Sequence, residues 1–378
     1  MAIIELKRNE KYKIETFIGY DNNGKKIRTY ETFEGKKSEA KMRDMQLKQK
    51  LRNGIIISKD KLTFEELSDK WIENHAKPKL SIKTVEEYIS MLPIINDVIG
   101  KYKINQITPL ILENFYNKLR MRENKKQLSE NTILHYYVLI GAIFNKAIKW
   151  RIIDINPNKS VDRPQMIKKQ ARYYDIEQIK DLLKIVNKLP LKYQALIRLA
   201  LDSGARVGEI LGLEWDDINF KKHTINITKT IIATKNGIKE KDKPKNNSSI
   251  RNIPITNETI KVLKKFKESQ DNLKSSLGNE WLGCKKAFTS DTGGYMHPST
   301  PNHILQKIIK NNNLPQTICF HSLRHSSASM QIALRIPSKV TSTRLGHASV
   351  TTTDAIYSHV SAFLEEEVVN KTNEVFKI

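Results

Sequence analysis

The pattern of apolar residues changes twice along this chain, and these changes most constrain its fold. Residues 1–55 carry strand-like runs, residues 62–160 follow a helical period, and residues 171–378 alternate between the two patterns. A chain of 378 residues is also too long for one ordinary hydrophobic core. The sequence therefore predicts a multidomain protein with boundaries near these positions.

The first segment predicts a small sheet followed by one helix. The runs YKIETFIGY (12–20) and KIRTYETF (26–33) are joined by the turn sequence DNNGK, which is typical of a β-hairpin. Ser38 is a candidate N-cap for the helix, and Gly54 stands beyond its end. The stretch GYDNNGKK resembles a phosphate-binding loop, but Lys26 stands where that loop needs Ser or Thr. No nucleotide site is predicted there.

The second segment predicts an all-α bundle of four helices. Thr63 and Glu66 form a capping box at the start of the first helix. Pro93 is expected to end or kink the second helix. The other three N-caps are expected at Ser81, Thr108 and Ser129.

The third segment follows a predicted linker from Asn156 to about Gln170, which holds prolines, polar residues and little periodicity. Helices are then expected near 176–188 and 191–203, and strands near 223–234 and 249–255 around the turn sequence KNG. Further helices complete the chain. This order predicts a mixed α+β domain that is mainly helical.

Positive charge is in excess along the whole chain, and it indicates the class of partner. The formal net charge is +24, of which residues 1–60 carry +6, residues 61–165 carry +5 and residues 166–378 carry +13. Solubility alone needs only a net charge of about 2–8 in a small domain. An excess in every segment is expected when several domains face one long polyanion, and it favours nucleic acid over a membrane surface.

The cysteines and the apolar runs indicate a cytoplasmic protein. Cys284 and Cys319 lie far apart without a CxxC pair, so neither a disulfide framework nor a cysteine-based zinc site is expected. The N-terminal run MAIIELKR is too short for a signal peptide. The longest uncharged run, Asn131 to Asn145, is too short for a membrane span.

The stretch HSLRH, residues 321 to 325, suggests either half of a metal site or a grip for a phosphate. His321 and His325 have the spacing of HExxH zinc helices, but Ser322 replaces the glutamate of that motif. Arg324 lies on the same helical face as His321 and would repel a divalent cation, whereas its guanidinium fits two phosphate oxygens. A surface helix with an ordinary histidine is an equally good interpretation of this motif alone.

Other motifs accompany this one. The stretch SGARVGE, Ser203 to Glu209, places Arg206 at a tight turn between helices, with Glu209 able to orient it, and LGH ends at His347, ten residues before Tyr357. In this combination the sequence resembles the tyrosine recombinases, the phage integrase family, whose motifs are GxRxGE, HxLRH, LGH and a following tyrosine. All four occur here in order. The resemblance covers the whole third segment and, more loosely, the two segments before it.

The resemblance implies a role for each matching residue, and no metal or cofactor. Arg206, Arg324 and His347 would hold the scissile phosphate, and His321 would assist proton transfer and phosphate binding. Tyr357 would be the nucleophile. Cations held in a dry site stabilise the charge that develops on an attacked phosphodiester. Such an enzyme would conserve the bond energy in a 3′-phosphotyrosyl ester and would rejoin the strands without ATP.

A lysine completes the set of six that the family uses, and it lies on a β-hairpin between the two arginine motifs. The pattern PKNNSSIRNIP implies Lys245 for this role, with Lys243 as the alternative. Neighbouring cations would lower the pKa of this lysine, so that it can protonate the leaving 5′ oxygen. His325 is expected to support the site structurally, and His359 to be a solvated neighbour.

The resemblance also implies an assembly on DNA. Residues 1–55 would bind arm-type sites, residues 62–160 would form a SAM-like core-binding domain, and residues 171–378 would be catalytic. The expected partners are double-stranded DNA with core and arm sites, a homotetramer acting through a four-way junction, an excisionase and a host DNA-bending protein in the bacterial cytoplasm. Competing hypotheses are a catalytically silent DNA-binding regulator, a metal-dependent transposase and a topoisomerase-like enzyme.

Overall fold

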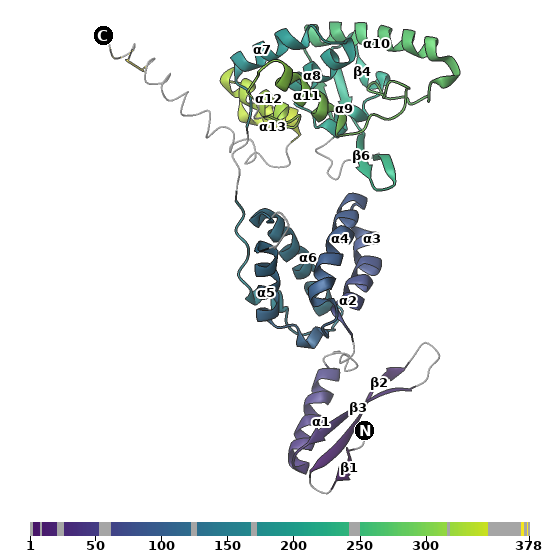
Figure 1. Ribbon diagram of the computed structural model, residues 1–378, viewed down its shortest axis with the longest axis vertical. Coiled ribbons are helices and arrows are strands. Elements are labelled where there is room, and N and C mark those ends of the chain that lie inside the picture. Colours follow the sequence, from purple (N-terminus) through teal and green to yellow (C-terminus); the bar gives the residue numbers. More distant parts are fainter. Residues whose placement is uncertain are drawn as a thin grey trace. The chain divides into compact units, whose positions relative to one another are not determined.

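The computed structural model describes residues 3–7, 10–20, 26–52, 62–121, 127–167, 172–241, 250–315 and 318–346, together with residues 372, 373 and 376 (Figure 1). The chain divides into two compact units, residues 1–168 and 169–378, and each is described by itself. Sheet-plus-helix, all-α and mixed parts follow one another along the chain. The predicted fold class is confirmed.

The N-terminal module is a three-stranded antiparallel sheet with one helix on it (Figure 1). The strands are β1 (Ile3–Lys7), β2 (Lys11–Tyr20) and β3 (Lys26–Glu34), and the helix is α1 (Lys37–Arg52). The predicted hairpin is present, and β1 is an additional strand. The Ser38 cap was wrong: the helix begins at Lys37, and the Lys36 backbone N–H donates to the Glu39 carboxylate at 2.9 Å. Gly54 lies outside the described residues.

In the helical part of the first unit, the four main helices begin at the four predicted N-caps. Its main helices are α2 (Phe64–Trp71), α4 (Ile82–Ile95), α5 (Pro109–Arg120) and α6 (Glu130–Lys149), with a short α3 (Lys77–Lys79) after α2. The hydroxyls of Thr63, Ser81, Thr108 and Ser129 each accept a backbone N–H of the first turn. Phe64, Phe144 and their neighbours form a separate hydrophobic core.

Two boundaries in this unit differ from the sequence expectations. Of the two alternatives for Pro93, an end of the helix is wrong: α4 continues to Ile95, and a π-helical turn follows at Asn96–Gly100, where the hydrogen-bond spacing changes. The predicted linker begins later than Asn156, because Asn158 is only 2% exposed and accepts a hydrogen bond from the Tyr116 hydroxyl at 2.5 Å. The two side chains satisfy each other inside the bundle, so this polar stretch packs on it.

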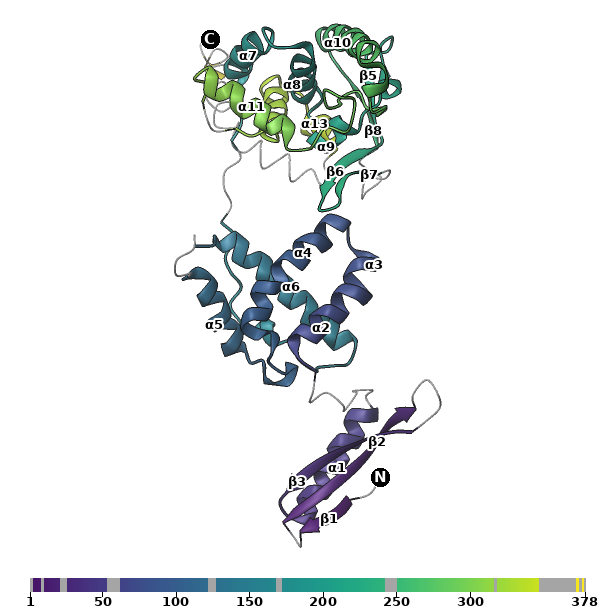
Figure 2. The ribbon, with the colours of Figure 1, turned by 45° about the vertical axis from the view of Figure 1, so that its right-hand side comes forward.

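The second unit is a mainly helical α+β structure. Its helices are α7 (Ile176–Val186), α8 (Leu191–Ser203), α9 (Val207–Gly212), α10 (Asn257–Leu277), α11 (Thr300–Asn311), α12 (Ser322–Ala333) and α13 (Ser338–Leu345). Helix α8 runs through the middle and packs against α10 and α12, and α12 packs against α13 (Figure 2). The predicted helices near 176–188 and 191–203 are confirmed as α7 and α8.

The strands of this unit form two sheets instead of the expected pair of strands. Strands β4 (Ile218–Asn219), β5 (Thr224–Ile227) and β8 (Arg251–Pro254) form one sheet, and β6 (Thr230–Thr234) and β7 (Gly237–Lys241) form a hairpin. The expected strand 223–234 is divided where α9 meets the chain. A Cβ on Gly212 would lie 2.7 Å from the Lys229 carbonyl oxygen, so this close approach requires glycine.

Candidate active site

The turn between α8 and α9 packs so tightly against its neighbours that it needs a glycine at position 204. Gly204 ends α8 in the left-handed region, with φ of +60°. A Cβ at this position would lie 2.2 Å from Leu345 Cδ2 and 3.2 Å from Ser327 Oγ. The end of α8 is therefore packed directly against α12 and the end of α13. The first and second arginine motifs and the start of the LGH motif meet here.

Arg206 follows this turn, and Glu209 holds it as the sequence predicts. The Glu209 carboxylate accepts the Arg206 backbone N–H at 2.9 Å and its Nη1 at 2.8 Å. Arg206 Nη2 donates to the carbonyl oxygen of Gly346 at 3.2 Å. The Arg206 side chain is still 42% exposed. One side of the guanidinium is fixed by the protein, and the group is open to a ligand.

Arg324 lies deeper, on α12, with 4% of its surface exposed. Its Nη1 donates to the carbonyl oxygens of Gly204 at 2.8 Å and Leu345 at 2.7 Å. Its Nη2 is buried and has no hydrogen-bond partner among the described residues. A buried cationic donor without an acceptor is costly, which indicates that an anion belongs at this atom.

The two arginines form one cationic centre. They donate to consecutive carbonyl oxygens, those of Leu345 and Gly346, at the end of α13. Burial, and then the positive charge of Arg206, lowers the pKa of Arg324 to about 9. Arg324 is still charged at pH 7, so the two guanidinium groups present positive charge to the same site.

The histidines of HSLRH stand beside this centre. The rings of His321 and His325 meet edge to face, with centroids 5.2 Å apart and planes at 85°. The His321 residue is exposed at the start of α12, whereas His325 is half-buried and its Nδ1 has no hydrogen-bond partner among the described residues. Partial desolvation of the rings lowers the pKa of both histidines, and the charge of Arg324 adds to the effect. Both are neutral at pH 7, so His321 can accept a proton.

The other predicted site residues lie outside the described residues. These are Lys245 with its alternative Lys243, and also His347, Tyr357 and His359. The chain just before each group is described: β7 ends at Lys241, and Gly346, the residue before His347, accepts the hydrogen bond from Arg206. The described part therefore brings together Arg206, His321, Arg324 and the start of the LGH motif.

Arg251 is a site residue that the sequence reasoning missed. Its Nη2 donates to Glu209 Oε2 at 2.8 Å, and its Nε donates to the Arg344 carbonyl oxygen at 2.9 Å. A signal for it was present in the sequence. Apolar and polar residues alternate along β8 and the residue after it, and Arg251 falls on the same inward face as the buried Ile253 and Ile255. Burial raises the pKa of Glu209, but the Arg251 hydrogen bond and charge, and then Arg206, outweigh it and lower that pKa. Glu209 is therefore ionised.

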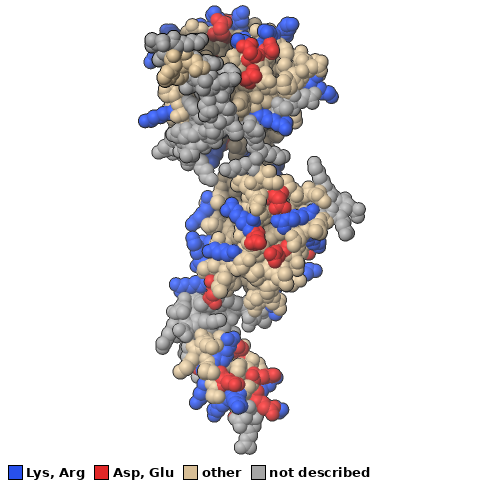
Figure 3. Space-filling view, turned by 90° about the vertical axis from the view of Figure 1, so that its left-hand side faces the viewer, with Lys and Arg blue, Asp and Glu red and all other residues tan. Residues whose placement is uncertain are grey.

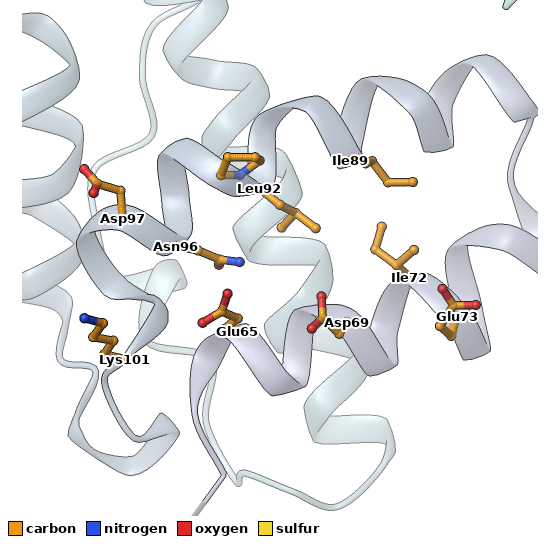
Figure 4. A pocket seen from close by; sticks show the side chains of 10 residues that line it. Glu65, Asp69, Ile72, Glu73, Ile89, Leu92, Asn96, Asp97 and Lys101 are labelled. Carbon is orange, nitrogen blue, oxygen red and sulfur yellow. The ribbon is translucent and has the colours of Figure 1, made fainter. Parts of the chain in front are cut away.

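A hollow of about 830 Å³ lies elsewhere, in the helical part of the first unit (Figure 4). Glu65 and Asp69 point into it from α2, and Leu92 and Asn96 from the facing helix. Its lining also includes Glu73 and Asp97, with Lys101 as the one cation. An acidic lining repels phosphate, so this hollow is unsuited to the DNA backbone.

Among the described residues, no group of three or more His, Cys, Asp or Glu side chains is arranged to hold a metal ion. Nor does this part of the chain contain a helix long and apolar enough to cross a membrane. Lys and Arg side chains are spread over the face in Figure 3, among fewer acidic ones.

Comparison with known proteins decides the family. The model of the phage integrase family matches residues 172–362, and the model of the phage integrase N-terminal SAM-like domain matches residues 63–120. The chain belongs to the phage integrase family. It is a tyrosine recombinase, an enzyme of site-specific DNA recombination. The four motifs named from the sequence lie within the first of these matches.

Individual relatives agree with this family. A tyrosine recombinase XerC-like protein of Caldanaerobacter subterraneus subsp. tengcongensis is 29% identical over 97% of this chain and 97% of its own. The Tn1549 transposon integrase in complex with transposon right end DNA is 20% identical, with a TM-score of 0.66 over 82% of this chain and 100% of that one. The lambda integrase tetramer bound to a Holliday junction is 18% identical, with a TM-score of 0.59 over 92% of this chain and 96% of that one. The two structures share the recombinase fold.

Proposed function

We propose that this enzyme cleaves one DNA strand by attack of Tyr357 on the scissile phosphate and rejoins it through a 3′-phosphotyrosyl ester. Six residues carry the reaction: Arg206, Lys245, His321, Arg324, His347 and Tyr357. The observation that carries the proposal is that the guanidinium groups of Arg206 and Arg324 meet at the end of α13. The Arg206 side chain is half-exposed, and Arg324 Nη2 is buried without a partner among the described residues.

The arginine pair suits a phosphodiester better than a metal or a neutral ligand. Guanidinium groups offer planar paired donors to phosphate oxygens. As the tyrosine attacks, phosphorus takes on more negative charge, and cations that are already in place stabilise it without reorganising. Arg206, Arg324 and His347 would hold the two non-bridging oxygens in this scheme.

Proton transfer completes the step. The Tyr357 hydroxyl has a pKa of about 10 when free, so its proton must be removed as the new P–O bond forms. We assign that proton to neutral His321. The P–O5′ bond breaks at the same time, and Lys245 protonates the leaving 5′ oxygen. Attack by a 5′ hydroxyl of the partner duplex reverses each step and releases the tyrosine.

The remaining segments would bind the DNA. The proposed domains are an arm-binding domain at 1–55, a core-binding domain at 62–160 and a catalytic domain at 171–378. The helical part and the second unit would hold the core site through phosphate contacts of Lys and Arg, in agreement with the charge excess. The assembly would be a homotetramer exchanging strands through a four-way junction, as the lambda integrase structure suggests. It would act on DNA in the bacterial cytoplasm, with an excisionase and a DNA-bending protein as candidate partners.

The test is covalent trapping on a suicide substrate. The full-length protein is first used to select its core site from a randomised DNA library, and that site is then nicked so that a short fragment diffuses away after cleavage. In the presence of EDTA we expect an adduct with wild-type protein and with the control Tyr193→Phe. Tyr357→Phe should bind the same duplex and form none. Binding without any adduct in the wild type would instead identify a silent DNA-binding regulator.

A further inference from the structure

We infer that Arg251 is a positioning residue of the phosphate grip: it neutralises Glu209 and fixes the end of α13, so that Arg206 stays available to the phosphate. The inference rests on the function proposed above. Arg251 is the first residue of β8, and its side chain is 7% exposed. Arg251 therefore acts on Arg206 and Arg324 from inside the protein.

The contacts of Glu209 support the first half of this role. Its Oε1 accepts Arg206 Nη1 at 2.8 Å, and its Oε2 accepts both the Arg206 backbone N–H at 2.9 Å and Arg251 Nη2 at 2.8 Å. Without Arg251, the full negative charge of this buried carboxylate would face Arg206 alone. Arg206 would then be paired one-to-one and less able to attract a phosphate.

Charge balance supports the same conclusion. Arg206, Arg251 and Arg324 carry three positive charges, and Glu209 carries one negative charge. The neighbouring Arg344 and Asp202 pair with each other at 3.1 Å and add no net charge. The described side chains of the centre thus carry a net charge of +2 toward the phosphate, and removal of Arg251 leaves +1. The lost charge is needed most in the transition state.

The end of α13 supports the second half. Arg251 Nε donates to the Arg344 carbonyl oxygen at 2.9 Å. Gly346 follows with φ of +69°, and a Cβ on it would lie 2.9–3.1 Å from the Arg251 guanidinium. The guanidinium thus packs under the glycine whose carbonyl oxygen binds Arg206, directly before His347. One side chain links the GxRxGE motif, β8 and the LGH motif.

The experiment compares Arg251→Met and Arg251→Lys with a control, Arg198→Met. Arg198 is a partly buried arginine of α8 whose Nη2 donates to Asn187 Oδ1. Single-turnover cleavage of the nicked suicide duplex is measured over a range of protein concentrations. The duplex carries either the normal scissile phosphate or a methylphosphonate there. A methyl group in place of one non-bridging oxygen removes the negative charge, so the site needs one cation fewer.

We expect Arg251→Met to lower the saturating cleavage rate on the normal duplex by about 10–100-fold, somewhat less than loss of a direct donor. Its half-saturating protein concentration should stay within about threefold of the wild type, because DNA binding depends on many phosphate contacts. On the methylphosphonate duplex, the cleavage rate of Arg251→Met should differ from the wild-type rate by less than about threefold. Arg251→Lys keeps the charge with fewer donors and should give a smaller defect on the normal duplex.

Each outcome decides the matter. A defect of equal size on both duplexes means that Arg251 is only structural, and cleavage equal to that of Arg198→Met means that it has no role; either overturns the inference while the proposed function stands. If Arg251→Met does not fold, Arg251→Gln, which is polar and also lacks the charge, takes its place in the same comparison. If the wild type forms no adduct at all, the proposed function fails, and the inference fails with it.

Discussion

Substitution of Gly204 by alanine tests whether the arginine motifs are packed together as described. Two costs are expected. The residue has φ of +60°, a conformation that costs an L side chain about 1–2 kcal/mol. The added Cβ would lie 2.2 Å from Leu345 Cδ2, and Leu345 is fully buried, so forced repacking adds about 1–3 kcal/mol.

The unfolded chain offsets part of this loss. Replacing glycine by alanine reduces the entropy of the unfolded state and returns about 0.4–1 kcal/mol. The free energy of unfolding of the second unit should therefore fall by about 1–4 kcal/mol, or roughly 2–4 °C in Tm for each kcal/mol. Gly283→Ala is the matched control, since Gly283 has φ of +72° and nothing within 4 Å of its added Cβ. The control carries the backbone strain without the clash.

Calorimetry of the full-length variants measures both changes, and the difference between them isolates the packing cost. The cleavage rate is a second measure, because the Leu345 carbonyl oxygen accepts Arg324 Nη1 and displacement of Leu345 should disturb that arginine. We expect Gly204→Ala to be the less stable variant and the slower enzyme. If it unfolds at the same temperature as Gly283→Ala and cleaves as fast as the wild type, the described meeting of α8, α12 and α13 is wrong.

Two further changes test the electrostatics of the second unit. Lys286 is 2% exposed and pairs with Glu214 at 2.7 Å and Glu240 at 2.9 Å. Both carboxylates also pair with Lys229, so Lys286→Met should lower the free energy of unfolding by about 1–3 kcal/mol. Lys267→Met, which breaks an exposed pair with Asp271, should change Tm far less, and equal effects would refute the burial argument. Desolvation lowers the pKa of His321 and of His325 from 6.5. Below that pH the folded protein therefore binds fewer protons than the unfolded chain. The stability of the folded state is kept above pH 6.5 and is lost as the pH falls. The fall in Tm from pH 7.5 to 5.5 should be smaller in a His321→Gln/His325→Gln variant, and an equal fall in both proteins would contradict this.

Local signals in the sequence predicted much of the fold because they act over a few residues. The four main helices α2, α4, α5 and α6 each begin at a Ser or Thr whose hydroxyl accepts a first-turn N–H, as at Thr63 and Ser129. The division of the strands after residue 227 could not be predicted in this way. It depends on the approach of Gly212 to the Lys229 carbonyl oxygen, a contact between elements.

The candidate site shows the same limit. The contact of Arg206 with Glu209 spans three residues and follows from the local turn. The contacts of Arg324 with Gly204 and Leu345, and those of Arg251 with Glu209 and Arg344, join distant parts of the chain. Arg251 carried only a weak signal, an arginine in phase with buried isoleucines, and its role depends on the tertiary structure.

The most direct test of the proposed mechanism is to identify the tyrosine that joins the DNA. Trypsin should release residues 345–371 as one peptide from the trapped adduct, and Tyr357 is the only tyrosine in it. Mass spectrometry should find this peptide linked through a phosphate to the 3′ end of the cleaved strand. A linkage at another residue, or to a 5′ end, would contradict the mechanism.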